Sequence, residues 1–122
     1  MKNIIIYGFD YEKTEAIISE YAGESIDYSA VYVEDGVHRE DRLLCHLKLG
    51  YDGVCPYIIM GSADILRAAD CVDAVRYFDW VKYGASIEIE NGHYIEDEKC
   101  GRGMLEYLKR QENSGFVRIF IH

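Results

Sequence analysis

The chain has 122 residues, 49% of them hydrophobic, and its 22 acidic residues against 13 basic residues give a formal net charge of −9. This length fits one domain around one core, so we expect a single domain over residues 1–122. The apolar runs are shorter than the roughly 18 residues of a membrane span, and no basic and long apolar leader opens the chain, so we expect a cytoplasmic protein with no membrane partner.

The four cysteines form no C-x-x-C pair, and three of them lie in apolar segments, where a reduced cysteine acts as a small hydrophobic residue. A zinc site built on Cys45 and His46 would require adjacent helix residues, which point about 100° apart, to share one ion. We therefore expect no metal site and no cofactor.

The first elements follow from an apolar run and its capping residues. The isoleucine run predicts a strand over about residues 3–9, and Asp10 can cap a helix that ends at Gly23. Residues 26–33 predict a second strand, which a Glu-Asp-Gly turn closes.

The middle of the chain predicts a helix, a strand and a loop. Leucines at helical spacing predict a helix over about 39–49, with Gly50 after it. Residues 54–60 predict a third strand that carries its proline near the start, and residues 61–69 predict a loop or a short first turn. The predicted buried stripe of the helix is Leu43, Leu44 and Leu47.

The last third predicts a long helix, a hairpin, a helix and a strand. Asp70 can cap a helix through Tyr83, which Gly84 closes. Asn-Gly between alternating residues of the SIEIENGHYIE segment predicts a type I′ hairpin. A helix over about 102–112 and a strand over 116–121 complete the chain. The predicted buried residues of the long helix are Val72, Val75, Phe78 and Val81.

This order of elements predicts an α/β fold. Right-handed crossovers would make the first three strands parallel and would bring Asp10, Asp35 and Met60 to one edge of the sheet. Ligands of α/β proteins bind at the carboxyl ends of such strands, so we expect the candidate site there.

Several segments, taken in order, carry a resemblance to a known family. They are YGFDY at 7–11, VYVEDG at 31–36, EDRLLCHLKLG at 40–50, the stretch 51–87 and CGRGMLEYLKR at 100–110. Together they resemble the N-terminal catalytic domain of the resolvase/invertase serine recombinases. The resemblance implies a three-layer resolvase-like fold, with a mostly parallel sheet, helices on both faces, and a C-terminal hairpin, helix and strand.

The chain departs from that family at the positions that carry its chemistry. In the family a serine attacks a DNA phosphate and arginines stabilise the developing charge. The serine position falls on Tyr11 and the first arginine position on Phe9, while Arg42 matches the arginine at the start of a helix. We assign no catalytic residue outright, and the candidates at the family's active-site positions are Tyr11, Arg42, Asp64 and Arg67.

Two of these matches leave alternatives open. Asp64 matches the family's Asp-Arg-Leu-x-Arg segment directly, but Arg67 matches its last arginine only if one residue is deleted. Arg42 follows two carboxylates, and an ion pair with a nearby carboxylate is the simpler role for it.

The terminal strand and the family bear on partners. Five of the six residues from 116 to 121 are apolar, so this strand should be covered on both faces inside the sheet of one chain or should pair with a second chain. The family assembles into dimers and tetramers, so we expect a homodimer or another form of self-association. The family's separate DNA-binding domain has no counterpart in this sequence, and we expect none.

These observations favour a catalytically degenerate recombinase-like domain that serves as a non-catalytic protein-interaction or regulatory module, with a mobile element or phage as one setting. One alternative is DNA strand cleavage by phosphoryl transfer with Tyr11 as nucleophile and Arg42 and Arg67 beside it. The acidic net charge disfavours DNA as a partner without excluding a local basic patch. A second alternative is a nucleotide or other small ligand at the C-terminal edge of the sheet.

Overall fold

The computed structural model describes residues 2–23, 27–34, 42–51, 53–90 and 99–122. In chain order its elements are β1 (Lys2–Phe9), α1 (Tyr11–Ala22), β2 (Tyr28–Val33), β3 (Leu43–Leu49), β4 (Ala63–Ala68), α2 (Cys71–Arg76), the 3-10 turn η1 (Phe78–Trp80), β5 (Val81–Ile89), α3 (Lys99–Asn113) and β6 (Val117–Ile121). No helix among the described residues is both long enough and apolar enough to cross a membrane.

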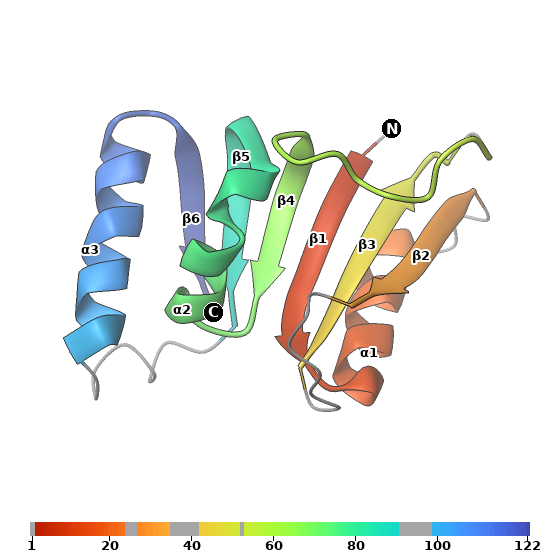
Figure 1. Cartoon of the computed structure of the whole chain (residues 1–122), viewed down its shortest axis with the longest axis horizontal. Helices are drawn as coiled ribbons and strands as arrows, with labels where there is room; N and C mark the ends of the chain where they lie inside the picture. The colour runs from red at the N-terminus through yellow and green to blue at the C-terminus, as the bar shows by residue number, and fades with distance from the viewer. Residues whose placement is uncertain (1, 24–26, 35–41, 52, 91–98) are drawn as a thin grey trace.

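The described strands form one six-stranded sheet in the order β2-β3-β1-β4-β5-β6 (Figure 1). β3 runs antiparallel to both of its neighbours, whereas β1, β4, β5 and β6 pair in parallel. The predicted α/β class with a mostly parallel sheet is therefore confirmed.

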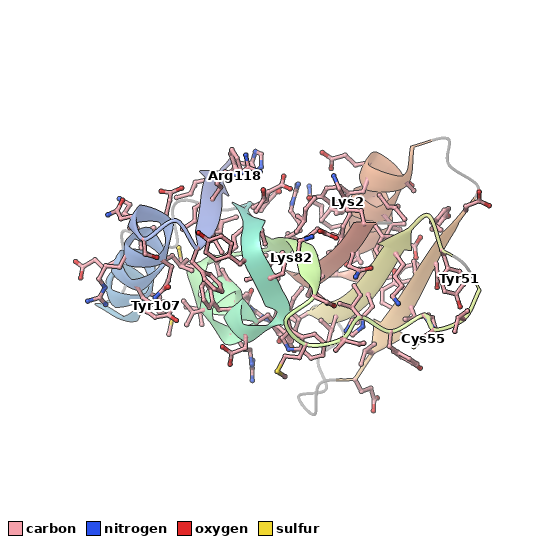
Figure 2. The ribbon with its side chains drawn as sticks, turned by 90° about the horizontal axis from the view of Figure 1, so that it is seen from above. Lys2, Tyr51, Cys55, Lys82, Tyr107 and Arg118 are labelled. Atoms are coloured by element: carbon pink, nitrogen blue, oxygen red, sulfur yellow. The ribbon has the colours of Figure 1, made fainter. Side chains whose placement is uncertain are left out.

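Helices cover both faces of this sheet, as Figure 2 shows from above. On one face, Ile17 and Ile18 of α1 pack into a core with Ile4 and Ile6 of β1. On the other face, residues of α2 and α3 share a second core with the side chains of β1 that point the opposite way. Because β1 is covered on both faces, it needs the continuous apolar run seen in the sequence rather than an alternating one.

The cap residues place the first helix where the sequence predicts it. The side chain of Asp10 accepts a hydrogen bond from the backbone N–H of Lys13, and Gly23 ends α1 with its N–H bonded to the carbonyl of Ser19. The predicted strand and helix at the C-terminal end, β6 and α3, are also confirmed.

The helix predicted over 39–49 is wrong, because residues Leu43–Leu49 form β3 and lie between β1 and β2. Leucines at 43, 44 and 47 fit a helical stripe, but they equally fit a central strand that is buried on both faces. Leu44 packs on the α2 side and Leu47 on the α1 side. The prediction that the first three strands run parallel is also wrong, because the third strand of the structure, β3, runs antiparallel to β1 and to β2.

The strand predicted over 54–60 is also wrong. This segment connects β3 to β4, and only Ile58 of it is buried, while Val54, Ile59 and Met60 are exposed. The strand is instead β4, in the segment predicted as a loop, so Met60 precedes a strand and does not lie at the C-terminal edge. Asp35 lies outside the described residues.

The long helix predicted from Asp70 to Tyr83 is shorter than expected. Asp70 does cap α2, but α2 ends at Arg76, and after η1 the chain enters β5, so Gly84 lies inside a strand. Val81 and Phe78 are buried as predicted, yet they belong to β5 and η1. The Asn-Gly hairpin falls on residues 91–98, outside the described residues.

Candidate functional site

The topology marks one place where a ligand site would be expected. The chain leaves β1 into α1 on one face and leaves β4 into α2 on the other, and β1 and β4 are parallel neighbours. The carboxyl ends of two such strands form a topological switch point, which is the usual ligand position in α/β sheets. This edge contains Gly8, Asp10, Arg42, Asp70 and Asp73.

Gly8 allows the backbone of β1 to approach α2 closely. It has a positive φ of 101° and sits at the irregularity in strand register between Tyr7 and Phe9. A Cβ on Gly8 would lie 2.4 Å from Oδ2 of Asp73 and 2.9 Å from Cβ of Ala69. The Gly in the YGFDY stretch is thus explained by close packing of α2 against β1.

Arg42 is bound to the carboxylates of α2. Its guanidinium forms an ion pair with Oδ1 of Asp73, lies 3.9 Å from Oδ2 of Asp70, and sits 5.9 Å from the ring centre of Tyr7. Burial alone would lower the pKa of Arg42, but Asp73 and Asp70 together hold that pKa above its ordinary value. Arg42 therefore forms an ion pair with a nearby carboxylate, which is the simpler of the two roles considered for it.

Asp73 is the most perturbed carboxyl group at this edge. Its burial and the neighbouring charge of Asp70 raise the pKa of Asp73 to about 6, against the opposing effect of Arg42. Oδ2 of Asp73 is buried and has no hydrogen-bond partner among the described residues. At this site the guanidinium of Arg42 is therefore paired with two carboxylates, those of Asp70 and Asp73.

The two helix N-termini at this edge are already occupied by side chains of the protein. Oδ1 of Asp10 accepts from the N–H of Lys13 at 2.8 Å, and Oδ1 of Asp70 accepts from the N–H of Asp73 at 2.9 Å. Helix N-termini bind phosphate through these same free N–H groups. A phosphate would have to displace a covalently tethered carboxylate at either position.

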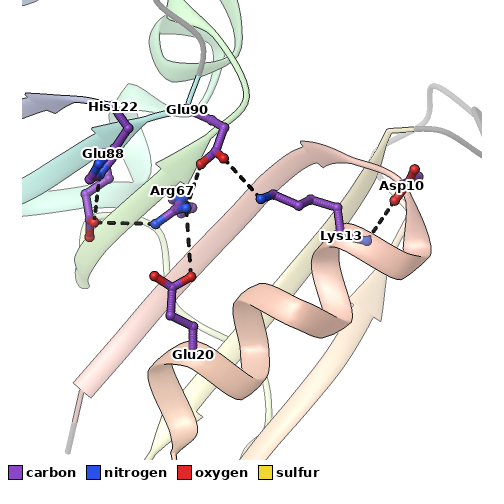
Figure 3. Close-up of polar contacts among 7 residues, drawn as sticks. All are labelled: Asp10, Lys13, Glu20, Arg67, Glu88, Glu90 and His122. Carbon is purple, nitrogen blue, oxygen red and sulfur yellow. Dashed lines mark hydrogen bonds and ion pairs between the residues drawn. The ribbon is translucent and has the colours of Figure 1, made fainter.

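Arg67 lies on the opposite face of the sheet, beside α1, in a network shown in Figure 3. Its Nη2 lies 2.6 Å from Oε2 of Glu90 and 3.9 Å from Oε2 of Glu20, and its Nη1 lies 3.5 Å from Oε1 of Glu88. Lys13 reaches Glu90 at 3.0 Å. Only 7% of the Arg67 side chain is exposed, so three carboxylates surround a buried cation.

Asp64 lies at the far end of the sheet from this edge. It is the second residue of β4, accepts a hydrogen bond from the N–H of Asn3 at 2.8 Å, and forms an ion pair with Lys82. Figure 2 shows Lys2 and Lys82 at this end of the sheet. Partial burial would raise the pKa of Asp64, but the Asn3 N–H and Lys82 hold it below its ordinary value.

Tyr11 stands apart from both arginines. It is the first residue of α1, is 61% exposed, and its ring centre lies 5.7 Å from that of Tyr32 on β2. Phe9 is buried in the core on the α1 side. The four candidate residues thus do not converge on one point. Tyr11 lies at an exposed helix start and Asp64 at the far end of the sheet. Arg42 and Arg67 lie on opposite faces of the sheet.

His46 is a buried polar residue that the sequence analysis considered only as a metal ligand. Its Nδ1 accepts a hydrogen bond from the N–H of Ile58 at 2.9 Å, and its ring lies against Trp80 and Tyr57. Burial, with a smaller effect of Lys48, lowers the pKa of His46 to about 4, so the ring is neutral at pH 7. The ring therefore fixes the segment around Tyr57 and Ile58 to β3 rather than carrying a catalytic proton.

The buried thiols and the acidic clusters offer no further chemistry. Burial raises the pKa of Cys45 to about 12 and that of Cys71 to about 11, so neither is a thiolate at neutral pH. Within the described part of the chain, no group of three or more His, Cys, Asp or Glu side chains is arranged to hold a metal ion.

The sequence contained a signal for part of this arrangement. A glycine inside a strand pattern predicts a bulge or a close backbone approach, which Gly8 makes. The roles of Asp73, Glu88 and Glu90 had no such signal, because they depend on the pairing of strands distant in sequence.

Comparisons with known proteins give a distant structural likeness. No family model matches the chain, and no curated protein matches it significantly. Among solved structures, the crystal structure of the pyruvate oxidoreductase subunit PORC from Thermotoga maritima is similar with a TM-score of 0.48 and 13% identity. The match covers 84% of this chain and 55% of that one.

Proposed function

We propose that this protein is a non-catalytic protein-interaction or regulatory module. One observation carries the proposal: both arginines among the candidate residues are bound to an excess of carboxylates, Arg42 by Asp70 and Asp73 and Arg67 by Glu20, Glu88 and Glu90. Phosphoryl transfer requires preorganised positive charge directed at the reacting group.

The separation of the candidate residues supports the same proposal. A nucleophile must lie within about 3–3.5 Å of the atom that it attacks, with the charge-stabilising groups around that atom. Tyr11 is exposed beside Tyr32, whereas Arg42 and Arg67 lie on opposite faces of the sheet. Because the sheet lies between the two arginines, one phosphate cannot bond to both.

The self-capped helices weigh against a nucleotide at the sheet edge. Asp10 and Asp70 occupy the N–H groups that a phosphate would need, and Asp73 adds a further carboxylate. A phosphorylated ligand there would be repelled by these carboxylates.

The proposal also covers the cellular compartment and the evolutionary origin of the protein. Cys45, Cys55 and Cys71 are free thiols, which fits the reducing cytoplasm. A degenerate relative of the serine recombinase domain in a mobile element or phage stays our hypothesis of origin. Two landmarks of that resemblance fall on other elements, because Arg42 precedes a strand and Asp64 to Arg67 lie inside one.

A DNA cleavage assay tests the proposal. Purified protein is incubated with supercoiled plasmid and with linear duplexes, and the products are examined for nicks and for covalent protein–DNA adducts. We expect neither product from the wild type or from Tyr11→Phe. An adduct that forms with the wild type and is lost in Tyr11→Phe would establish tyrosine-based strand cleavage and end the proposal.

A further inference from the structure

The two edges of the sheet differ in how their backbone groups are satisfied. β2 forms one edge and β6 the other (Figure 1). An edge strand presents unpaired N–H and C=O groups that can pair with another chain, and proteins usually block such edges with charges, prolines or covering side chains.

The β6 edge is blocked at its centre. The N–H of His122 bonds to Ile89 of β5, so the alternation along the strand directs the backbone of Ile119 outward. That outward N–H donates to Oε2 of Glu112 of α3 at 2.8 Å. A second chain that pairs with β6 would have to displace this carboxylate.

The β2 edge carries no such block among the described residues. The N–H of Gly50 bonds to the carbonyl of Asp27, so the alternation directs the backbones of Tyr28, Ala30 and Tyr32 away from β3. None of these three outward N–H groups has a hydrogen-bond partner in the described part of the chain. Among the described residues, nothing occupies these backbone groups of the β2 edge.

The composition of β2 also favours pairing. Its sequence, YSAVYV, contains no charge, no proline and no glycine, although the whole chain carries a net charge of −9. Short uncharged segments rich in β-branched and aromatic residues are the ones that add to other strands. Tyr28 and Tyr32 are 43% and 39% exposed, so apolar area at this edge lies in water.

β2 is complementary to itself about Ala30. In an antiparallel pair centred there, Tyr28 lies opposite the partner's Tyr32, Tyr32 lies opposite the partner's Tyr28, and the small Ala30 meets the partner's Ala30. All three residues direct their backbones outward, so each aligned pair is of the hydrogen-bonded kind. Aromatic cross-strand pairs stabilise a sheet, and a twofold axis makes both halves of the interface identical.

We propose that a second copy of this chain pairs with β2 in antiparallel orientation about Ala30, which joins the two sheets into one. The inference rests on the proposed interaction role and names its partner. The twofold axis is perpendicular to the sheet, so both α1 helices lie on the same face. Tyr11, stacked on Tyr32, then lies beside the partner's Tyr28 and becomes part of the interface.

Sedimentation velocity over a range of protein concentrations tests the inference. The wild type should form a dimer whose dissociation is visible on dilution. Ala30→Pro removes an outward N–H without removing a β2–β3 bond, and Tyr28→Lys adds a charge on the edge, so each should raise the dimer dissociation constant at least about tenfold. Phe120→Lys, which changes an exposed aromatic residue of β6, is the matched control and should dimerise like the wild type.

Amide hydrogen exchange on the same variants provides a readout that loss of folding would not imitate. The amides of Tyr28, Ala30 and Tyr32 should exchange slowly in the dimer and quickly in dilute monomer, while β1 amides stay protected in both. Tyr28→Lys should keep β1 protection and lose the protection of the Ala30 amide.

Two results would overturn the inference. One is a wild type that stays monomeric at the highest concentration measured, and the other is a dimer that Phe120→Lys dissociates and Tyr28→Lys does not. Either result leaves the non-catalytic assignment standing, because only a covalent DNA adduct removes that.

Discussion

Gly8 shows how a single residue determines the geometry of the candidate site. Its positive φ lets β1 bend at the point where α2 approaches, and its missing side chain leaves room for the Asp73 carboxylate. Gly8 therefore serves to bring a carboxylate close to the end of β1.

The first prediction concerns this glycine. Gly8→Ala should destabilise the fold by more than about 2 kcal/mol in urea unfolding, because strain at positive φ adds to a collision with Asp73. Gly61→Ala is the matched control, since Gly61 has a similar positive φ of 86° but no atom within 4 Å of its Cβ position. The control should lose only about 1 kcal/mol. Equal losses would show that contact with α2 does not matter.

The second prediction concerns His46 and pH. The pKa of His46 in the folded state is about 4, below the ordinary 6.5, so the unfolded chain takes up the proton first as pH falls. The contribution of His46 to stability is present above pH 6.5 and is lost as pH falls from 6.5 towards 4.

His46→Asn keeps an acceptor for the Ile58 N–H and removes the titration. The difference in unfolding free energy between wild type and variant should shrink by about 2 kcal/mol between pH 7 and pH 5. A difference that stays constant over this range would mean that His46 is solvated in the folded protein.

At the scale of elements, the polar network on the α1 side joins helix to sheet. Arg67 of β4 contacts Glu20 of α1 and Glu88 and Glu90 of β5 and its continuation, and Tyr21 of α1 donates to Glu88 at 2.7 Å. The network therefore links three segments that are distant in sequence. Arginine suits this position because its planar guanidinium can bind several carboxylates at once.

The third prediction tests this link. Arg67→Met should lower the unfolding free energy by about 3 kcal/mol, because it leaves partly buried carboxylates facing one another. Arg118→Met is the control, since Arg118 is an exposed arginine of β6, and it should change stability by less than about 0.5 kcal/mol. If the unfolding free energy falls by the same amount in both variants, the Arg67 network contributes no more to stability than a surface charge does.

The sequence predicted the helix ends that have clear caps and the uninterrupted isoleucine run of β1, and it failed at β3 and β4. Asp10, Gly23 and Asp70 marked helix ends correctly because capping is a local interaction. The segment LLCHLKL could not be assigned, because a strand between two others has no polar face and its leucines also match a helical stripe.

The candidate site was predictable only in part. The expected edge joined strands at 3–9, 26–33 and 54–60, whereas the structure brings Arg42 to the carboxyl ends of β1 and β4. Arg67 was expected beside Arg42, but its face of the sheet depends on the residue parity of β4, a strand that the sequence did not reveal. Asp64 was one of the same candidates and lies at the other end of β4.

At the scale of the whole molecule, both candidate arginines are paired with carboxylates inside the chain, and among the described residues one sheet edge stays open. Arg42 and Arg67 are bound by carboxylates, Asp10 and Asp70 cap α1 and α2, and Glu112 blocks the β6 edge. Against these satisfied groups, β2 presents an uncharged strand with outward backbone groups. This contrast supports our proposal that the molecule binds another protein chain and does not bind phosphate.

An NMR titration of uniformly ¹⁵N-labelled protein tests that central claim most directly. Inorganic phosphate and a short DNA duplex are added in turn, and the amide shifts at the strand ends are followed. We predict no saturable shift of the Gly8, Lys13 and Asp73 amides with either ligand, while the Tyr28, Ala30 and Tyr32 amides shift with protein concentration alone. Saturable shifts of Gly8, Lys13 and Asp73 on addition of phosphate or DNA would contradict the account.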